Sequence, residues 1–442
     1  MTLLAETPVA PATAPLERAP DRTEQPAAGR GSRLSVVGSG ERVLHPKPSG
    51  KPDPTGHLTA EQVEALGREL DALRQEVIDS RGARDAAYIR KVIKANRYLE
   101  MGSRAVLLFS GFPPAWLLGT AGLSIAKIVD NMEIGHNIMH GQWDWMRDPK
   151  IHSTTWEWDN VSPSSQWKKS HNETHHTYTN VIGHDDDLGY GLFRVDDDQP
   201  WTLGSLGQPL YSLINAVFFE YGIASYDLKL RGILKGEREP QEYKPELAEF
   251  LRKIRRQVGR DYLLHPLLSG PNFLTTLGAN VVANIVRNVW TNSIILCGHF
   301  PYGVETFATD SIEGETRGEW YVRQMLGSGN ISGSRVIHFM SGNLSHQIEH
   351  HIFPDLPSNR YIEIAPRVRE ICERYDLKYV TGSFPHQLAS AWTKIFVLAL
   401  PNKSPDRSRA SVVREAAAQA VGQQAQKVRA RLAARKARRQ EA

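Results

Sequence analysis

Cysteine is scarce in this chain: among 442 residues there are two, Cys297 and Cys372. Two thiols cannot build a disulfide framework or a cysteine-rich metal site, and their low number favours a reducing compartment. A strong excess of one charge is also missing, because the formal net charge is only +4. The composition therefore predicts no nucleic-acid partner.

Low average hydropathy conceals three long apolar runs. The mean hydropathy of −0.40 is that of a polar protein, but the runs near 105–126, 199–224 and 262–300 are largely free of charged side chains. A membrane-spanning helix needs roughly 20 mostly apolar residues. We therefore predict an all-α, multi-pass membrane protein with about four transmembrane helices in a 2+2 arrangement and a cytoplasmic helical cap. A large all-helical core is the alternative.

The two ends of the chain differ in composition from its middle. Residues 1–56 are rich in Pro and Ala and predict a disordered tail. Residues 405–442 form a basic, Ala/Arg-rich tail that either meets anionic lipid headgroups or keeps the protein soluble. Between them, residues 57–400 form one predicted domain. It opens with the capping-box pattern "TAEQ" at 59–62, followed by an apolar stripe at helical spacing: Val63, Leu66, Leu70, Leu73 and Val77.

Histidine is concentrated in three short segments. Eight of the sixteen histidines lie in "HNIMH", "HNETHH" and "HQIEHH". Histidines four positions apart share one face of a helix and can converge on one metal ion. One such pair is weak evidence, whereas three clusters beyond apolar runs predict a metal centre. The candidate ligands are His136, His140, His171, His175, His176, His346, His350 and His351.

The number of candidate ligands favours two metal ions. Neutral imidazole binds Zn, Cu, Fe and Ni, and eight ligands exceed the need of one tetrahedral zinc. Carboxylates near the clusters are candidates to orient the rings, namely Glu133, Glu173, Asp185 and Glu349.

The clusters and their flanking phrases resemble those of the integral-membrane fatty acid desaturases. The phrases are "NMEIGHNIMHGQWDWM", "HHTYTNVIGHDDDLGYG", "CGHFP" and "HQIEHHIFPDLPSNRY". They are most similar to bacterial acyl-CoA desaturases of the stearoyl-CoA Δ9 kind. The resemblance covers about residues 57–400.

This resemblance implies an enzyme of the bacterial cell membrane with its active site on the cytoplasmic side. It implies a di-iron centre, O2 as co-substrate and a cis double bond introduced into a stearoyl or palmitoyl chain. A ninth histidine ligand in the family matches His299, and a family asparagine one turn earlier has Ile295 in its place here. Asn292 is the weaker candidate for that role, and Glu349 is a second supporting residue.

The substrate and the electron source follow from the chemistry. Removing hydrogens from unactivated methylenes requires a redox metal, and two electrons per turnover must come from outside. Their expected source is NAD(P)H through a separate reductase or ferredoxin-like donor. The predicted partners are an acyl-CoA or other acyl substrate, this donor and membrane lipid. Four tryptophans either line an acyl tunnel or anchor the protein at the interface, namely Trp143, Trp145, Trp156 and Trp158. Lys168 and Lys169 either meet the phosphates of CoA or are solvated.

Three other functions remain open. "QIEHH" also occurs in front-end (Δ6-type, linoleoyl-CoA) desaturases, where Gln replaces the first histidine of the cluster. A membrane fatty acid or alkane hydroxylase would use the same metals. A membrane metal carrier is the non-enzymatic alternative, although transport sites lie near the bilayer midplane.

Overall fold

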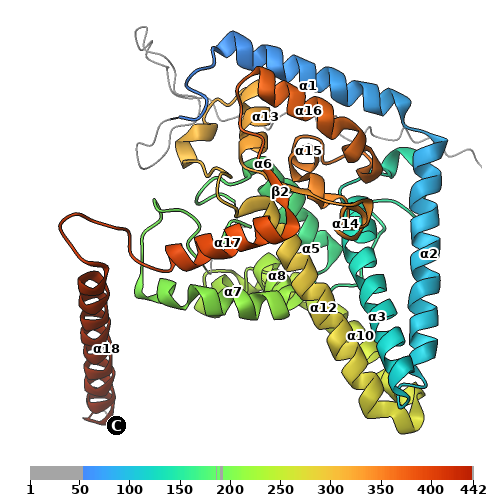
Figure 1. Ribbon diagram of the computed structural model, residues 1–442. Helices are drawn as coiled ribbons and strands as arrows, with labels where there is room; N and C mark the ends of the chain where they lie inside the picture. Colours follow the sequence, from blue (N-terminus) through green and yellow to red (C-terminus); the bar gives the residue numbers. More distant parts are fainter. Residues whose placement is uncertain (1–52, 186, 190–192, 441–442) are drawn as a thin grey trace, which may run out of the picture. The chain divides into compact units, whose positions relative to one another are not determined.

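A computed structural model describes residues 53–185, 187–189 and 193–440. The predicted tail at 1–56 lies almost wholly outside this part of the chain. The described residues are mostly helical, as predicted, and Figure 1 shows how the helices are arranged. The predicted basic tail is an α-helix from Arg409 to Gln440.

The α-helices vary widely in length. They are α1 (Ala60–Ser80), α2 (Ala83–Leu107), α3 (Pro113–Val129), α4 (Asn137–Met139), α5 (Ser164–Trp167), α6 (His176–Tyr178), α7 (Gln208–Val217), α8 (Phe219–Asp227), α9 (Leu230–Lys235), α10 (Pro240–Val258), α11 (His265–Leu268), α12 (Phe273–His299), α13 (Arg317–Leu326), α14 (Arg335–Met340), α15 (Gln347–Ile352), α16 (Tyr361–Arg374), α17 (Phe384–Leu398) and α18 (Arg409–Gln440). Two short strands, β1 (Asn330–Ser332) and β2 (Thr381–Ser383), pair in parallel with Ile331 opposite Gly382.

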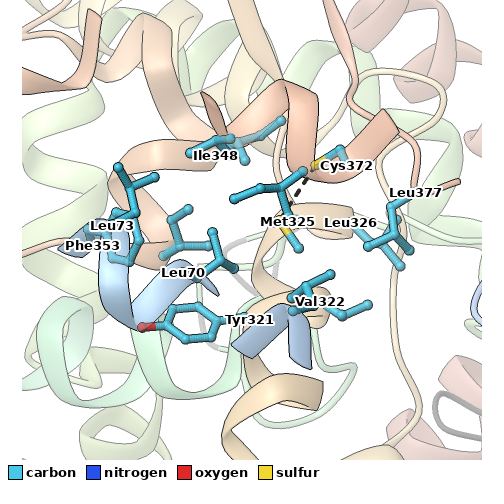
Figure 2. Packing of buried hydrophobic residues seen from close by; sticks show 14 of the residues in the cluster. Leu70, Leu73, Tyr321, Val322, Met325, Leu326, Ile348, Phe353, Cys372 and Leu377 are labelled. Atoms are coloured by element: carbon cyan, nitrogen blue, oxygen red, sulfur yellow. Dashed lines mark hydrogen bonds between the residues drawn. The ribbon is translucent and has the colours of Figure 1, made fainter. Parts of the chain in front are cut away.

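The first helix forms as its sequence predicts. Thr59 caps α1 by accepting a hydrogen bond from the backbone N–H of Gln62. All five residues of the apolar stripe are buried, and α1 packs on α13 and α16 (Figure 1). Figure 2 shows Leu70 and Leu73 among Tyr321, Met325 and Cys372, whose sulfur lies 3.6 Å from that of Met325. This core covers the histidine-bearing helix α15, which contributes Ile348 and Ile352 to it.

The predicted four-span membrane arrangement is wrong. Within the described residues, no helix combines the length and the apolar character that crossing a bilayer requires. The run at 105–126 is divided, because α2 ends at Leu107 and the Pro113-Pro114 pair starts α3. The run at 199–224 is divided at Phe218, between α7 and α8.

The third apolar run, at 262–300, does not form a membrane-spanning helix for a different reason. Its longest helix, α12, has 27 residues, but it buries a polar face that includes Asn280, Asn284 and Arg287. The guanidinium of Arg287 lies 2.6 Å from the carboxylate of Glu220, and both side chains are 1 % exposed. Buried charges are tolerated when they are paired and hydrogen-bonded. The charges of α12 therefore bind it to the neighbouring helix α8.

A second buried ion cluster joins α3 to the segment before α12. The ammonium of Lys127 lies 2.7 Å from Asp261 and 2.8 Å from Asp159. Lys127 is 1 % exposed. Helices α2 and α12 both pack on α3 (Figure 1). The continuation of α3 carries His136, and α12 ends at His299.

Candidate metal centre

Two of the three histidine clusters lie in π-helical turns. The π-helix η1 (Asp130–His136) continues α3 and ends at His136. The short helix α4 follows η1, and His140 is the residue directly after α4. The π-helix η3 (Lys168–His175) continues α5 and contains His171 and His175. Single π-helical turns within α-helices are rare and occur frequently at functional sites, because they redirect side chains relative to an α-helix.

The other histidines come from distant parts of the chain. His299 is the last residue of α12, and His350 and His351 lie on α15. The structure brings eight of the nine predicted ligands together in one buried cluster. This cluster contains His136, His140, His171, His175, His176, His299, His350 and His351.

The cluster divides into two groups of converging nitrogen atoms. In the first, ligand atoms of His136, His140, His171 and His350 all lie within 4.8 Å of one another. In the second, the same holds for His175, His299 and His351. Two neighbouring groups of this kind provide positions for two metal ions.

His176 lies between the two groups. Its ring stacks on His351 at 4.4 Å between centroids and lies 4.7 Å from the ring of His140 and 4.8 Å from that of His350. His171 and His175 also adjoin across the groups, with ring centroids 5.0 Å apart. The two groups therefore form one centre.

Burial keeps most of these imidazoles neutral. It lowers the pKa of His136 to about 3 and places the pKa of His140, His176 and His350 well below the usual value of 6.5. The exception is His175, whose pKa is raised because the carboxylate of Asp185 outweighs the effect of burial. A neutral imidazole is the form that binds a metal ion.

Several of the ring nitrogens have no hydrogen-bond partner among the described residues. They are Nε2 of His140, Nε2 of His171, Nδ1 of His299 and both nitrogens of His176, all of which are buried. A buried polar atom without a partner costs free energy. Metal ions bound to these nitrogens would remove that cost, and the residues present therefore suit a centre of two ions with nitrogen ligands.

The ninth predicted ligand, His346, lies elsewhere. Its ring stacks on His338 at a centroid distance of 4.6 Å and an interplanar angle of 26°. The prediction treats 346 and 350 as one helical turn, but α15 begins only at Gln347 and His346 ends a 3₁₀ turn. The geometry therefore does not bring His346 to the other eight histidines.

Gln347 occupies the place that His346 was expected to fill. Its amide Nε2 lies 2.9 Å from Nε2 of His299, and its side chain lines the cavity beside the histidines. The spacing of Gln347 to His351 is i, i+4 within α15, which puts both on one face. The "QIEHH" pattern was the signal in the sequence for this position.

Two carboxylates form hydrogen bonds with histidines of the segment "HNETHH". Asp185 accepts a hydrogen bond from Nδ1 of His175 at 3.0 Å, and Asp187 lies 3.0 Å from Nδ1 of His171. Of these two, the sequence analysis proposed Asp185. Asp187 was missed, although the run "HDDD" just after the cluster contains it. Such hydrogen bonds orient metal-binding imidazoles and fix their tautomers.

The other proposed supporting residues differ in their surroundings. Burial raises the pKa of Glu349 to about 7, and this carboxyl group accepts hydrogen bonds from Asn330 and Tyr379. Glu133 is similarly buried and accepts hydrogen bonds from Tyr88 and Ser358. Glu173 is exposed.

Asn292 is buried in α12, where the cavity beside the histidines is lined by Thr291 and Ile295. The structure thus places a hydroxyl and an aliphatic side chain of this helix, rather than the asparagine, on the cavity wall.

The four predicted tunnel tryptophans are dispersed. Trp158 lines the cavity beside the histidines. Trp143 is fully buried in another cluster, the indole N–H of Trp145 donates to the carbonyl of Gln142, and Trp156 lines a separate surface cleft.

Trp167 was missed, and it is the tryptophan nearest the centre. Its ring stacks on His171 at 4.4 Å and meets His136 edge-on at 5.2 Å. Trp158 lies 5.2 Å from Trp167. The two rings, with Phe219, Ile223 and Ile295, give the cavity an apolar wall next to the candidate ligands.

Comparisons with known proteins agree with this geometry. The family model described as "Fatty acid desaturase" matches residues 110–383. A protein of Mycobacterium tuberculosis named NADPH-dependent stearoyl-CoA 9-desaturase is 51% identical over 355 residues, which are 79% of this chain and 83% of that protein. The sn-1 linoleoyl-lipid 6-desaturase of Synechocystis is 26% identical over 286 residues, which are 63% of this chain and 79% of that protein. The matched segment contains all eight converging histidines, and the chain belongs to the fatty acid desaturase family.

Proposed function

We propose that this protein is an acyl-CoA desaturase that introduces a cis double bond at the Δ9 position of a stearoyl or palmitoyl chain. The observation that carries the proposal is the two-part cluster of eight histidines in a chain that is 51% identical, over most of its length, to a protein named stearoyl-CoA 9-desaturase. Removal of two hydrogens from adjacent methylenes is beyond ordinary acid, base or nucleophilic side chains.

The proposed centre holds two iron ions. His136, His140, His171 and His350 would hold one ion, and His175, His299 and His351 the other, with His176 between them. When bound, the irons supply the O2-dependent oxidation of the acyl chain.

The protein's own residues keep the ligands neutral and oriented. Burial lowers the pKa of His350 and His351, so that protons do not compete with the metal near neutral pH. Asp185 and Asp187 fix the ring positions of His175 and His171. The apolar wall of Trp158, Phe219 and Ile295 excludes water and provides the surface along which an acyl chain is held against the centre.

The electrons come, in this proposal, from NADPH through a separate reductase or ferredoxin-like protein. The name of the mycobacterial relative includes NADPH dependence. Purified protein that desaturates with NADPH and no added partner would contradict a separate donor.

A front-end desaturase is the second candidate function. It is favoured by the position of Gln347 beside His299 and by the 26% identity to a 6-desaturase. The 51% identity to the 9-desaturase favours Δ9.

The test is mass spectrometry of fatty acids, derivatised at the double bond, from host cells that express the protein together with a reductase. New Δ9 monoenes are expected, and the His350→Ala variant serves as the inactive control. New double bonds at Δ6 would favour the front-end alternative, and hydroxylated products would indicate a hydroxylase.

A further inference from the structure

Helix α13 supplies hydrogen-bond donors to the end of the helix that carries the segment "HNETHH". That helix ends with α6, and the carbonyls in the last turn of a helix need donors from outside it. The amide Nε2 of Gln324 donates to the carbonyl of His176 at 3.0 Å. The guanidinium of Arg323 donates to the carbonyls of Thr177 at 2.9 Å and Thr179 at 3.3 Å. Two adjacent side chains of α13 thus cap this helix end.

The bond to His176 fixes which end of the Gln324 amide faces the metal centre. A backbone carbonyl can only accept, so the amide nitrogen must be the atom that points at it. The amide oxygen, Oε1, then lies 3.0 Å from Nδ1 of His351. Reversing the amide would place two acceptor oxygens against each other inside the protein, where Gln324 is 0 % exposed. Gln324 therefore presents an acceptor to His351.

A second acceptor faces the same nitrogen. The hydroxyl of Thr179 donates to the carbonyl of His175 at 2.8 Å, and its oxygen lies 3.2 Å from Nδ1 of His351. The single hydrogen of this hydroxyl is used by the carbonyl, so the oxygen can only accept from His351. Because both groups are acceptors, Nδ1 must carry a proton. In the neutral ring the lone pair that can bind a metal ion is then on Nε2.

The other nitrogen of His351 points into the metal centre. Its Nε2 lies 3.2 Å from Nε2 of His299, and His351 belongs to the second group together with His175 and His299. Nδ1 of His350 also lies beside a hydrogen-bonding group, the hydroxyl of Tyr361, at 3.3 Å. The hydrogen bonds around His351 therefore direct the nitrogen with the lone pair towards the position of the second ion.

We propose that Gln324 is a positioning residue of the metal centre: with Thr179 it holds the proton of His351 on Nδ1, so that Nε2 is the atom offered to the ion of the second group. This inference rests on the proposed function, because that function supplies the two ions. It adds a residue of α13, outside the three histidine segments, that sets the affinity for one of them.

The metal affinity of the full-length Gln324→Met protein tests the inference. Methionine keeps the length of the side chain and removes both its acceptor and its donor. We expect the affinity for one of the two ions to fall about 10- to 100-fold, measured with Fe²⁺ and separately with Co²⁺ by competition with a chelator, while the other ion is retained. The visible absorption of bound Co²⁺ should change as well, because it reports the ligands around that ion.

Gln387→Met is the matched control. Gln387 is 3 % exposed and donates to the carbonyl of Asn330 at 3.0 Å, so this variant also loses a buried hydrogen bond of an amide. Chemical denaturation should show a loss of stability in both variants, whereas Gln387→Met should keep the metal affinity and the Co²⁺ absorption of wild type. Equal metal affinities in the two variants would mean that Gln324 only packs and caps, and would overturn the inference.

Gln324→Glu separates the acceptor from the donor. The ionised carboxylate keeps an oxygen towards Nδ1 of His351 but cannot donate to the carbonyl of His176. We expect a metal affinity at or above that of wild type, together with a lower midpoint of unfolding. A Gln324→Glu protein that binds metal as weakly as Gln324→Met would contradict the role assigned to the amide oxygen.

Failure of this inference can be told apart from failure of the proposed function. If Gln324→Met loses affinity for one ion as expected, but cells that express wild type make no new monoene, the inference stands and the proposed function fails. If wild type is an active desaturase and Gln324→Met holds both ions as tightly as wild type, the inference is wrong and the proposed function stands. Wild-type protein that binds no metal would overturn both.

Discussion

The Nε2 atoms of His136 and His350 lie 3.4 Å apart, although 214 positions separate the two residues in the chain. Both rings are buried, and burial lowers the pKa of both, so the two nitrogens face each other in neutral rings. A neutral imidazole carries one proton on two nitrogens, and Nδ1 of His350 lies 3.3 Å from the hydroxyl of Tyr361. The two facing nitrogens are therefore placed as two ligands of one metal ion would be.

Replacing His350 should remove metal from the centre. His350→Ala deletes a nitrogen that converges with those of His136, His140 and His171, so we expect purified protein to lose at least one of two irons and to make no product. Iron is measured by mass spectrometry of the metal.

His346→Ala is the matched comparison. This ring is also buried, but it stacks on His338 rather than on the candidate ligands. We expect His346→Ala to keep its iron. An iron content as low as that of His350→Ala would restore His346 as a ligand and contradict the geometry of α15.

Asp185 should control how tightly the second group holds metal. Its carboxylate lies 3.0 Å from Nδ1 of His175 through both oxygens. Asp185→Asn keeps the shape but removes the charge that raises the pKa of His175. We expect iron affinity to fall about 10- to 100-fold, measured by competition with a chelator. Asp144→Asn, whose carboxylate accepts a hydrogen bond from Ser153 instead, should leave the affinity unchanged.

Gly342 should be required for the approach of two histidine-bearing segments. Its φ is +68°, and an added Cβ would lie 2.5 Å from the carbonyl carbon and oxygen of Met132 in η1. Gly342→Ala therefore combines backbone strain with a steric clash. We expect the free energy of unfolding to fall by at least about 2 kcal/mol more than in a control without the clash.

Gly314→Ala provides that control. Gly314 has nearly the same φ, +69°, and among the residues that the structure describes no heavy atom lies within 4 Å of its added Cβ. This variant should lose only about 1–2 kcal/mol from the left-handed conformation. Equal losses in the two variants, by chemical denaturation, would show that the contact with η1 is unimportant.

Asp227 should make stability depend on pH. Burial raises the pKa of this carboxyl group from 3.8 to about 6, and it accepts hydrogen bonds from Ser162 and Ser170. Because the pKa of Asp227 is higher in the folded state, the folded protein binds this proton more tightly than the unfolded chain does. The resulting contribution to the free energy of unfolding is fully present below pH 3.8 and is lost as the pH rises through about 6.

Asp227→Asn removes this dependence. At pH 8 the variant should exceed wild type in free energy of unfolding by roughly 3 kcal/mol, and at pH 4 the difference should largely disappear. Denaturant titrations at several pH values measure it. A constant difference across this range would mean that Asp227 is not buried as a neutral acid.

Patterns with a fixed local period were read correctly from the sequence. The capping box and the apolar stripe of α1 depend only on neighbours within a few turns, and both are present. The histidine segments likewise predicted one cluster, and seven of their eight histidines converge, whereas the eighth converging histidine, His299, came from the family resemblance. Metal binding by this cluster stays a prediction. The prediction that His346 and His350 share one helical face was not met, because the boundary of α15 lies between them.

Apolar runs were misread because hydropathy counts residues without their partners. Arg287 and Lys127 are among the most deeply buried side chains of the protein. Each is compensated by a carboxylate distant in sequence, Glu220 for Arg287 and Asp261 for Lys127. Such pairings cannot be read from a hydropathy average, and the run at 262–300 was misread for this reason. The runs at 105–126 and 199–224 were misread because helix ends divide them.

By itself, the sequence determined the chemistry of this protein: imidazoles in three clusters, a helical domain around them and the family to which they belong. Tertiary structure alone decided which nitrogens face one another, that Gln347 rather than His346 turns towards His299, and that Trp167 stacks on His171. The physical reason is that ligand identity is a property of residue type, whereas convergence depends on where each helix begins, on π-helical turns and on long-range packing.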